Sequence, residues 1–418
     1  MKTNKIMTTA IMAVTLIGAL SILMSCESTG AGGTNARPEI KELAADIVAG
    51  SGSSDPEYFI GHAGAVYFAA EDSSHGVELW KYDGTSATLV EDIYSGSDDS
   101  DPDSFVVFDG TLYFQAENSA SGMELWKVNS GSDSASLAAD INSGAGDGHW
   151  GHAVVHDGYI YFQGNDGSNG KNLYRYDGST VEFRTGLSGT YSSWPAYITV
   201  YNNTLYFNAE TNSDSELYYY DSASNSMKLP ALEEVNPSAT GSMPAELLVY
   251  DGNLYFEADS GNGDGRELYM YDQGDSDGNN EIYEQITTIR SGGNAQIGDV
   301  TVYGTKLYFT ANNGVREYIY SYDGNTVTRH DDIAGGHTPY YPGSLEVYDG
   351  QLYFSADDGS HGRELWRYNG QNAELVWDIN PGSGSSYPYG MTAIDGRLYF
   401  NADNGSIGDE LFVYQSPK

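Results

Sequence analysis

The feature that most constrains the fold is an internal repeat that occurs eight times along the chain. A Tyr-Phe pair returns at intervals of 45 to 53 residues, and each pair lies in a unit of four short apolar runs separated by turn residues. The tyrosines of these pairs are Tyr67, Tyr113, Tyr161, Tyr206, Tyr255, Tyr308, Tyr353 and Tyr399. The chain is therefore predicted to consist of eight copies of one small structural unit.

The unit is clearest between Ser344 and Ile379. Asp349-Gly350 separates the first two apolar runs and Asn369-Gly370 separates the last two. Such dipeptides accept positive φ at both turn positions, which favours tight antiparallel hairpins. The predicted strands are Leu345 to Tyr348, Leu352 to Ala356, Glu364 to Tyr368 and Glu374 to Ile379. Four-stranded units that repeat every ~40–50 residues are typical of β-propeller blades.

The two ends of the chain indicate how the ring closes. The last unit ends after its third strand, Glu410 to Tyr414, whereas residues Lys41 to Ile47 read like a fourth strand without a unit. A displaced strand of this kind is explained if the N-terminal segment pairs with the last unit, because closure removes exposed sheet edges. We predict an all-β fold, an eight-bladed β-propeller of four-stranded antiparallel blades that an N-terminal strand closes.

The N-terminal region is typical of an exported lipoprotein. Met1 to Lys5 is basic and Ile6 to Met24 is apolar, as in an export signal. Leu23-Met24-Ser25-Cys26 resembles the lipobox of bacterial lipoproteins, and an uncleaved membrane anchor is the alternative. The expected division is 1–25 signal peptide, 26–38 acylated Cys26 and flexible tether, and 39–418 propeller.

Composition limits the partners that the chain can have. A formal net charge of −40 excludes a nucleic acid as partner, because phosphate binding needs a basic face. The single cysteine, Cys26, excludes an internal disulfide. Most of the 35 tyrosines fall at fixed repeat positions, so they are expected in the core rather than at a ligand surface. Trp80, Trp126 and Trp366 are assigned to packing for the same reason.

The third strands carry a motif with a family resemblance. Gly76 to Thr85 reads GVELWKYDGT and Ala356 to Gly370 reads ADDGSHGRELWRYNG. These segments resemble the ELWxxDGT repeat family of bacterial exported proteins. The resemblance implies a propeller-like repeat architecture and a location outside the cytoplasm, and it supplies no catalytic residues.

The candidate binding residues come from a comparison of the eight units. A proline stands eleven residues before most of the Tyr-Phe tyrosines, and the residue in front of it varies from unit to unit. These connections are expected on one face around the central channel, where aromatic rings beside carboxylates would suit a sugar. Ordinary packing of loop aromatics on the rim is the alternative. The candidates are Trp150, Trp194, Tyr197, Tyr340, Tyr341, Tyr387, Tyr389, His149, Asp55 and Asp101.

Metal sites and catalytic groups find less support. Acidic and amide residues follow each second strand, such as Glu71 and Asp357, and could ligate calcium, although capping of their own turns is the stronger reading. His149, His152 and His156 form a local cluster without a carboxylate at a fixed spacing. We therefore assign no metal site, no cofactor except an optional calcium, and no catalytic residue.

Together these features predict a monomeric, lipid-anchored protein of the bacterial cell envelope, at the outer membrane or cell surface. It would touch the membrane only through its lipid and bind a glycan or a protein partner through the loop face of the propeller. A polysaccharide-active enzyme, either a glycosidase or a lyase, is the first alternative. An envelope assembly scaffold is the second.

Overall fold

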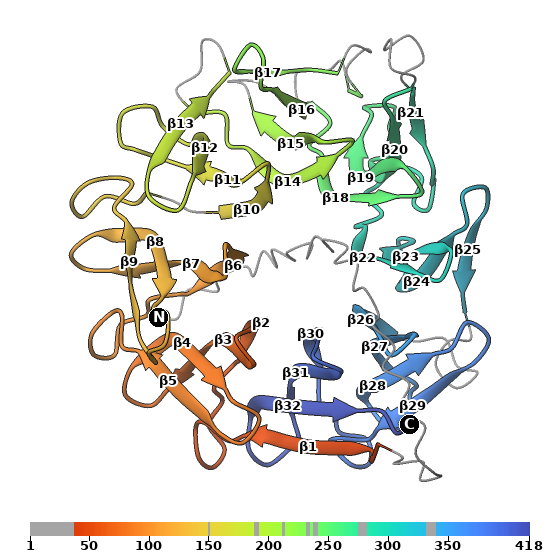
Figure 1. Cartoon of the computed structure of the whole chain (residues 1–418). Helices are drawn as coiled ribbons and strands as arrows, with labels where there is room; N and C mark the ends of the chain where they lie inside the picture. Colours follow the sequence, from red (N-terminus) through yellow and green to blue (C-terminus); the bar gives the residue numbers. More distant parts are fainter. Residues whose placement is uncertain are drawn as a thin grey trace, which may run out of the picture.

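The computed structural model describes residues 37–148, 151–187, 192–210, 214–230, 235–236, 241–274, 282–331 and 340–418, with the backbone alone at positions 340 and 341. These residues form 32 strands in eight antiparallel four-stranded sheets, and no helix that could cross a membrane lies among them. The sheets stand around a central axis as the blades of a propeller (Figure 1). The predicted eight-bladed β-propeller is confirmed.

Each sheet is a meander whose first strand lies nearest the axis and whose fourth strand lies at the periphery (Figure 1). Blades 1 to 4 consist of β2 (Glu57–His62), β3 (Ala65–Asp72), β4 (Gly76–Tyr82), β5 (Ala87–Glu91); β6 (Asp103–Phe108), β7 (Thr111–Asn118), β8 (Gly122–Val128), β9 (Ala135–Ala139); β10 (Gly151–His156), β11 (Tyr159–Gly164), β12 (Asn172–Tyr176), β13 (Val181–Thr185); and β14 (Ala196–Tyr201), β15 (Thr204–Glu210), β16 (Ser215–Asp221), β17 (Ser226–Lys228). Blades 5 to 8 consist of β18 (Ala245–Tyr250), β19 (Asn253–Asp259), β20 (Arg266–Asp272), β21 (Ile282–Gln285); β22 (Gly298–Tyr303), β23 (Lys306–Asn312), β24 (Glu317–Tyr322), β25 (Val327–His330); β26 (Tyr340–Tyr348), β27 (Gln351–Asp357), β28 (Arg363–Tyr368), β29 (Ala373–Trp377); and β30 (Tyr389–Ile394), β31 (Arg397–Asp403), β32 (Asp409–Gln415), β1 (Ile40–Ala45).

The hydrophobic core lies between neighbouring blades. In β27, Tyr353 packs into the cluster shared with blade 8, whereas Phe354 packs into the cluster shared with blade 6, and both side chains are fully buried. This division follows from the alternation of side chains along a strand. The Tyr-Phe pair therefore packs its own blade against both neighbouring blades. The prediction that the repeated tyrosines belong to the core is confirmed. Trp80, Trp126 and Trp366 are buried as predicted.

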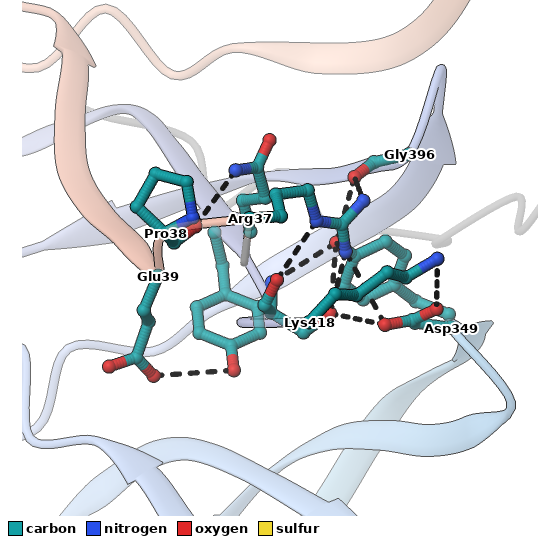
Figure 2. A network of polar contacts seen from close by, with 10 residues as sticks. Arg37, Pro38, Glu39, Asp349, Gly396 and Lys418 are labelled. Carbon is teal, nitrogen blue, oxygen red and sulfur yellow. Dashed lines mark hydrogen bonds and ion pairs between the residues drawn. The ribbon is translucent and has the colours of Figure 1, made fainter. Parts of the chain in front are cut away.

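The N-terminal strand closes the ring. β1 pairs antiparallel with β32, from Ile40 opposite Gln415 to Ala45 opposite Leu411. Ahead of β1, Arg37 donates hydrogen bonds to the backbone oxygens of Ser416 at 3.0 Å and Gly396 at 3.3 Å (Figure 2). The same guanidinium reaches the Asp349 carboxylate at 3.4 Å. The predicted closing strand is confirmed.

Closure also determines on which side of the ring the first described residues lie. We call the side with the connections between first and second strands, and between third and fourth strands, the hairpin face, and the opposite side the loop face. β1 begins beside the end of β32, and Arg37 lies against the hairpin turns at Asp349 and Gly396. Arg37, the first described residue, therefore lies at the hairpin face.

Candidate functional site

The connections on the loop face are held by a buried glutamate from the ELW motif. The Glu78 carboxylate accepts hydrogen bonds from the backbone N–H groups of Ile93 and Tyr94, both at 2.9 Å, and from the Ser100 hydroxyl at 2.6 Å. It thus binds the whole segment between the fourth strand of blade 1 and the first strand of blade 2. Equivalent buried glutamates holding the same segment are Glu124, Glu216, Glu267, Glu364 and Glu410.

This glutamate clamp was missed at the level of sequence, although its signal was present. The motif glutamate stands two residues before a core aromatic, and the sequence pattern places it in the third strand without indicating what it binds. Burial raises the pKa of Glu78, Glu124 and Glu364 to about 7. The hydrogen bonds to these carboxylates lower the pKa, but their effect is smaller than that of burial. In blade 3, Asn172 takes the place of the glutamate and accepts the Ser193 hydroxyl at 2.6 Å.

The clamped segment presents one residue per blade on the loop face in a left-handed backbone conformation. In all six blades where this position is described, φ lies between 43° and 52° and the side chain is exposed. We call these residues the rim ring: Asp55, Asp101, Trp194, Met243, Gln296 and Tyr387. Positive φ is a genuine outlier for large side chains such as tryptophan, whereas glycine adopts it without strain.

A second left-handed residue follows three positions later, at a β-bulge in the innermost strand of each blade. The register of these strands shifts there in every blade, for example between Glu57 and Ile60 of β2. We call these residues the bulge ring: Tyr58, Ser104, His152, Tyr197, Glu246, Asp299, Ser344 and Gly390. Seven of the eight are not glycine, so both rings carry side chains on a backbone that would suit glycine better.

The predicted aromatic candidates have different surroundings. Trp194 is 43% exposed, with the Lys171 ammonium 4.2 Å from the ring centroid, and Tyr387 is 57% exposed. Tyr197 is half-buried, and its ring centroid lies 5.4 Å from that of His152. Tyr389 is half-buried and tied into a hydrogen-bond network. Of the predicted aromatic candidates whose side chains are described, Trp194 and Tyr387 are the exposed ones, and they lie in two separate arcs of the rim ring.

The remaining candidates are only partly described. Asp55 and Asp101 are exposed on the rim ring. Tyr340 and Tyr341 belong to β26, of which only the backbone is described at these positions. His149, Trp150 and Cys26 lie outside the described residues.

Carboxylates gather where blades 8, 1 and 2 meet at the loop face. Tyr389 donates to Glu57 at 3.3 Å, and Asn401 donates to the Tyr389 hydroxyl at 2.6 Å. Burial raises the pKa of Glu57, and the neighbouring Asp55 carboxylate raises it further. Burial likewise raises the pKa of Asp103 to about 7.

The next blades around the ring balance their charges locally. In blade 5, Arg266 forms an ion pair with Glu257 at 2.7 Å and donates to the Met243 carbonyl at 2.6 Å. In blade 7, Arg363 donates to the Ser355 hydroxyl at 2.7 Å; burial lowers the pKa of Arg363, and the Glu317 and Asp299 charges act in the opposite direction. The loop face is therefore an asymmetric surface on a repeated framework.

Comparison with known proteins supports the architecture. A scan against family models and a search of curated proteins both return no match. Among solved structures, a Mycobacterium tuberculosis puromycin-hydrolysing peptidase aligns with a TM-score of 0.52 and 10% identity, over 83% of this chain and 57% of that one. A structure from a study of two prolyl endopeptidases aligns with a TM-score of 0.51 and 11% identity, over 84% of this chain and 55% of that one.

A third solved structure, the β-propeller domain of the trilobed protease from Pyrococcus furiosus, aligns with a TM-score of 0.44 and 11% identity, over 87% of this chain and 97% of that domain. This chain spans little more than half the length of the two peptidases. Their likeness establishes the fold alone.

In five blades the acidic or amide residue after the second strand caps its own turn, whereas in blade 1 the turn is capped by Asp72 and not by Glu71. Asp357 accepts the N–H of Gly359 at 2.6 Å, and Asp403 accepts that of Gly405 at 2.6 Å. Asn165, Asp259 and Asn312 make the same bond in their blades. This is the capping arrangement that sequence favoured over calcium ligation. Within the described ranges, no group of three or more acidic, histidine or cysteine side chains is arranged to hold a metal ion.

The two described histidines of the local cluster pack on different aromatic rings. His152 lies against Tyr197, whereas His156 lies 6.2 Å from Tyr161, measured between ring centroids. Burial lowers the pKa of His152 to about 4, so this side chain is neutral at physiological pH. The bulge between Gly151 and Val154 interrupts the alternation that would have placed both histidines on one strand face.

Proposed function

We propose that this protein is a binding protein that recognises a glycan through the rim ring on the loop face of its propeller. The observation that carries the proposal is the occupancy of the rim ring. Glycine would avoid a strain of about 1–3 kcal/mol at each left-handed position, yet Trp194, Met243 and Tyr387 stand there with large exposed fractions. The framework beneath is the same in each blade, so the side chains differ for a reason other than folding.

The chemistry of the rim ring suits a sugar. Flat rings such as those of Trp194 and Tyr387 stack on the apolar face of a pyranose, and carboxylates such as Asp55 accept hydrogen bonds from hydroxyl groups. The two rings lie in blades 4 and 8, on opposite sides of the propeller axis (Figure 1). This separation favours an extended oligosaccharide over a single sugar.

A glycan array tests the proposal. Wild type is expected to bind a subset of glycans that the double variant Trp194→Ala, Tyr387→Ala no longer binds. Phe183→Ala is the matched control, because Phe183 is 39% exposed but lies on the outermost strand β13. Equal binding by wild type and the double variant would exclude the rim ring as the glycan site. A protein partner that is lost only in the double variant would instead assign this surface to protein recognition.

We also propose that Cys26 is acylated and tethers the propeller to an envelope membrane. Because Arg37 lies at the hairpin face, this tether would leave the loop face directed away from the membrane. Labelled palmitate in growing cells is expected to mark the wild type and not Cys26→Ala. Label that persists in Cys26→Ala would contradict the anchor without affecting the binding proposal.

A polysaccharide-active enzyme is the second candidate, and the carboxyl groups with raised pKa favour it. A group such as Asp103, with a pKa of about 7, could serve as a general acid at neutral pH. Any glycan that binds should therefore be incubated with wild type and with Asp103→Asn. New reducing ends or unsaturated sugars that appear only with the wild type would establish catalysis, whereas an unchanged glycan would leave a binding role.

A further inference from the structure

The meeting point of blades 8, 1 and 2 differs from the rest of the loop face in its charge. We call Asp55, Glu57, Asp103 and Asp409, with Tyr58, Tyr387 and Tyr389, the acidic sector. Among the described residues, no lysine or arginine forms an ion pair with any of its four carboxylates. The sector thus combines aromatic side chains with carboxylates that no described lysine or arginine pairs with.

The repeat shows where the compensating charges would have been. The residue before the ELW glutamate is Lys171 in blade 3, Arg266 in blade 5 and Arg363 in blade 7. Lys171 lies over the Trp194 ring, Arg266 forms an ion pair with Glu257, and Arg363 donates a hydrogen bond to Ser355. The same position in blades 8, 1 and 2 holds Asp409, Val77 and Met123. Three consecutive blades, and also blade 4 with Ser215 and blade 6 with Glu317, therefore lack the cation that blades 3, 5 and 7 have at this position.

The carboxylates of the sector are close enough to repel one another. Burial raises the pKa of Asp409 to about 6, with the Asp55 and Asp403 charges adding to the effect. Tyr58 is 38% exposed, and its pKa is raised by burial and by the charges of Glu57 and Asp103. A cation placed among these groups would relieve both the repulsion and the lost solvation.

The buried polar network behind the sector contains an unused acceptor. Asn401 is fully buried and donates its amide N–H to the Tyr389 hydroxyl, which in turn donates to Glu57. The Asn401 Oδ1 atom has no hydrogen-bond partner among the described residues. Buried polar groups are nearly always satisfied, so this acceptor calls for a donor that the described residues do not provide.

We infer that the acidic sector recognises a cationic group, and that the glycan bound by the rim ring carries free amines, as in an oligosaccharide of glucosamine. The inference rests on the proposed function and specifies its ligand. A protonated amine supplies positive charge to Asp55 and Glu57, and an ammonium group is attracted to the faces of exposed tyrosines such as Tyr387 and Tyr58. Arg363 lies near Tyr387 at the border of the sector, where burial lowers its pKa and the charges of Glu317 and Asp299 act in the opposite direction.

Titration calorimetry with two oligomers of equal length tests this inference. Short glucosamine oligomers are expected to bind roughly tenfold more tightly than the neutral N-acetylglucosamine oligomers, with a preference that weakens as salt is added. The double variant Asp55→Asn, Glu57→Gln should bind both oligomers about equally. Asparagine tolerates the left-handed backbone at position 55, so the fold is expected to persist and thermal unfolding verifies this.

The matched control is the double variant Asp109→Asn, Asp251→Asn. Both aspartates are exposed, have φ of 47° and 46°, and lie in hairpin turns on the opposite face. This variant should keep the amine preference of the wild type. Loss of the preference in the control variant, or its retention in the sector variant, would refute the inference.

The remaining outcomes separate the inference from the proposed function. If both oligomers bind equally to the wild type and Trp194→Ala weakens both, the amine specificity is wrong and the glycan proposal stands. If neither oligomer nor any glycan on the array binds, the proposed function fails. Binding of a lysine-rich peptide in place of both oligomers would assign the sector to a basic protein and overturn the glucosamine inference.

Discussion

At the scale of single residues, a buried glutamate in six of the eight blades determines the shape of the loop face. Glu364 accepts the N–H of Ile379 at 2.7 Å and the Ser386 hydroxyl at 2.6 Å while it is fully buried. These hydrogen bonds favour the carboxylate, but burial outweighs them and raises the pKa to about 7. The segment that carries the rim ring is thus held by a group that titrates near neutrality.

This titration predicts that stability depends on pH. The pKa of Glu364 is raised from 4.5 in the unfolded chain to about 7 in the folded protein, and those of Glu78 and Glu124 rise equally. A raised pKa contributes stability that is fully present below the unfolded value and is lost as the pH rises through the folded value. The thermal unfolding midpoint should therefore fall by a few degrees between about pH 5 and pH 8.

The variant Glu364→Gln separates this effect from the general acidity of the chain. It removes one titrating group, so the dependence of stability on pH should become flatter. It also replaces one carboxylate oxygen, a hydrogen-bond acceptor, by an amide N–H donor, which should lower the free energy of unfolding by about 1–3 kcal/mol. Glu42→Gln, at an exposed position of β1, is the control and should leave both unchanged. An equal pH slope in wild type and Glu364→Gln would contradict the titration.

At the scale of the blade, two connections on the loop face pack directly against each other at a glycine. Gly362 precedes β28 with φ of 70°, and a Cβ atom there would lie 2.0 Å from the backbone oxygen of Gly384. Equivalent collisions with backbone would occur at Gly76, Gly122, Gly265 and Gly408. The glycine before the ELW motif is therefore required by packing as well as by φ, which explains its place in the repeat.

A pair of glycine variants isolates the packing requirement. Gly362→Ala should destabilise the protein by the cost of positive φ, about 1–3 kcal/mol, plus the displacement of the Gly384 segment. Gly350→Ala carries the same strain at φ of 74°, but nothing lies within 4 Å of the added Cβ. Denaturant unfolding of the two variants should show Gly362→Ala to be clearly the less stable, and equal values would disprove the steric account.

At the scale of the whole molecule, the fold could be predicted from the sequence because the same pattern recurs in every blade. The Tyr-Phe pair recurs eight times and a turn dipeptide such as Asp349-Gly350 precedes five of these pairs, so the strand order, the blade number and the closing strand follow from the sequence. The bulge at Tyr58 and the clamp at Glu78 could not be derived, because both depend on which backbone atoms meet in space. The charge of the acidic sector likewise arises only when Asp409 of blade 8 meets Asp55 of blade 1.

The last prediction concerns the closure of the ring. Deletion of residues 1–49 removes β1, Arg37 and the partner of β32, and it leaves the backbone of β32 unpaired at a sheet edge. The blade 8 and blade 1 packing that includes Ile40, Ala44 and Ile47 is lost as well. Because exposed edges promote association, the deleted protein should unfold at a lower temperature and form oligomers.

Deletion of residues 1–36 is the matched control, since it keeps Arg37 and β1 and should remain a stable monomer. Thermal unfolding and light scattering report both properties, and identical behaviour of the two proteins would show that β1 is dispensable for the ring.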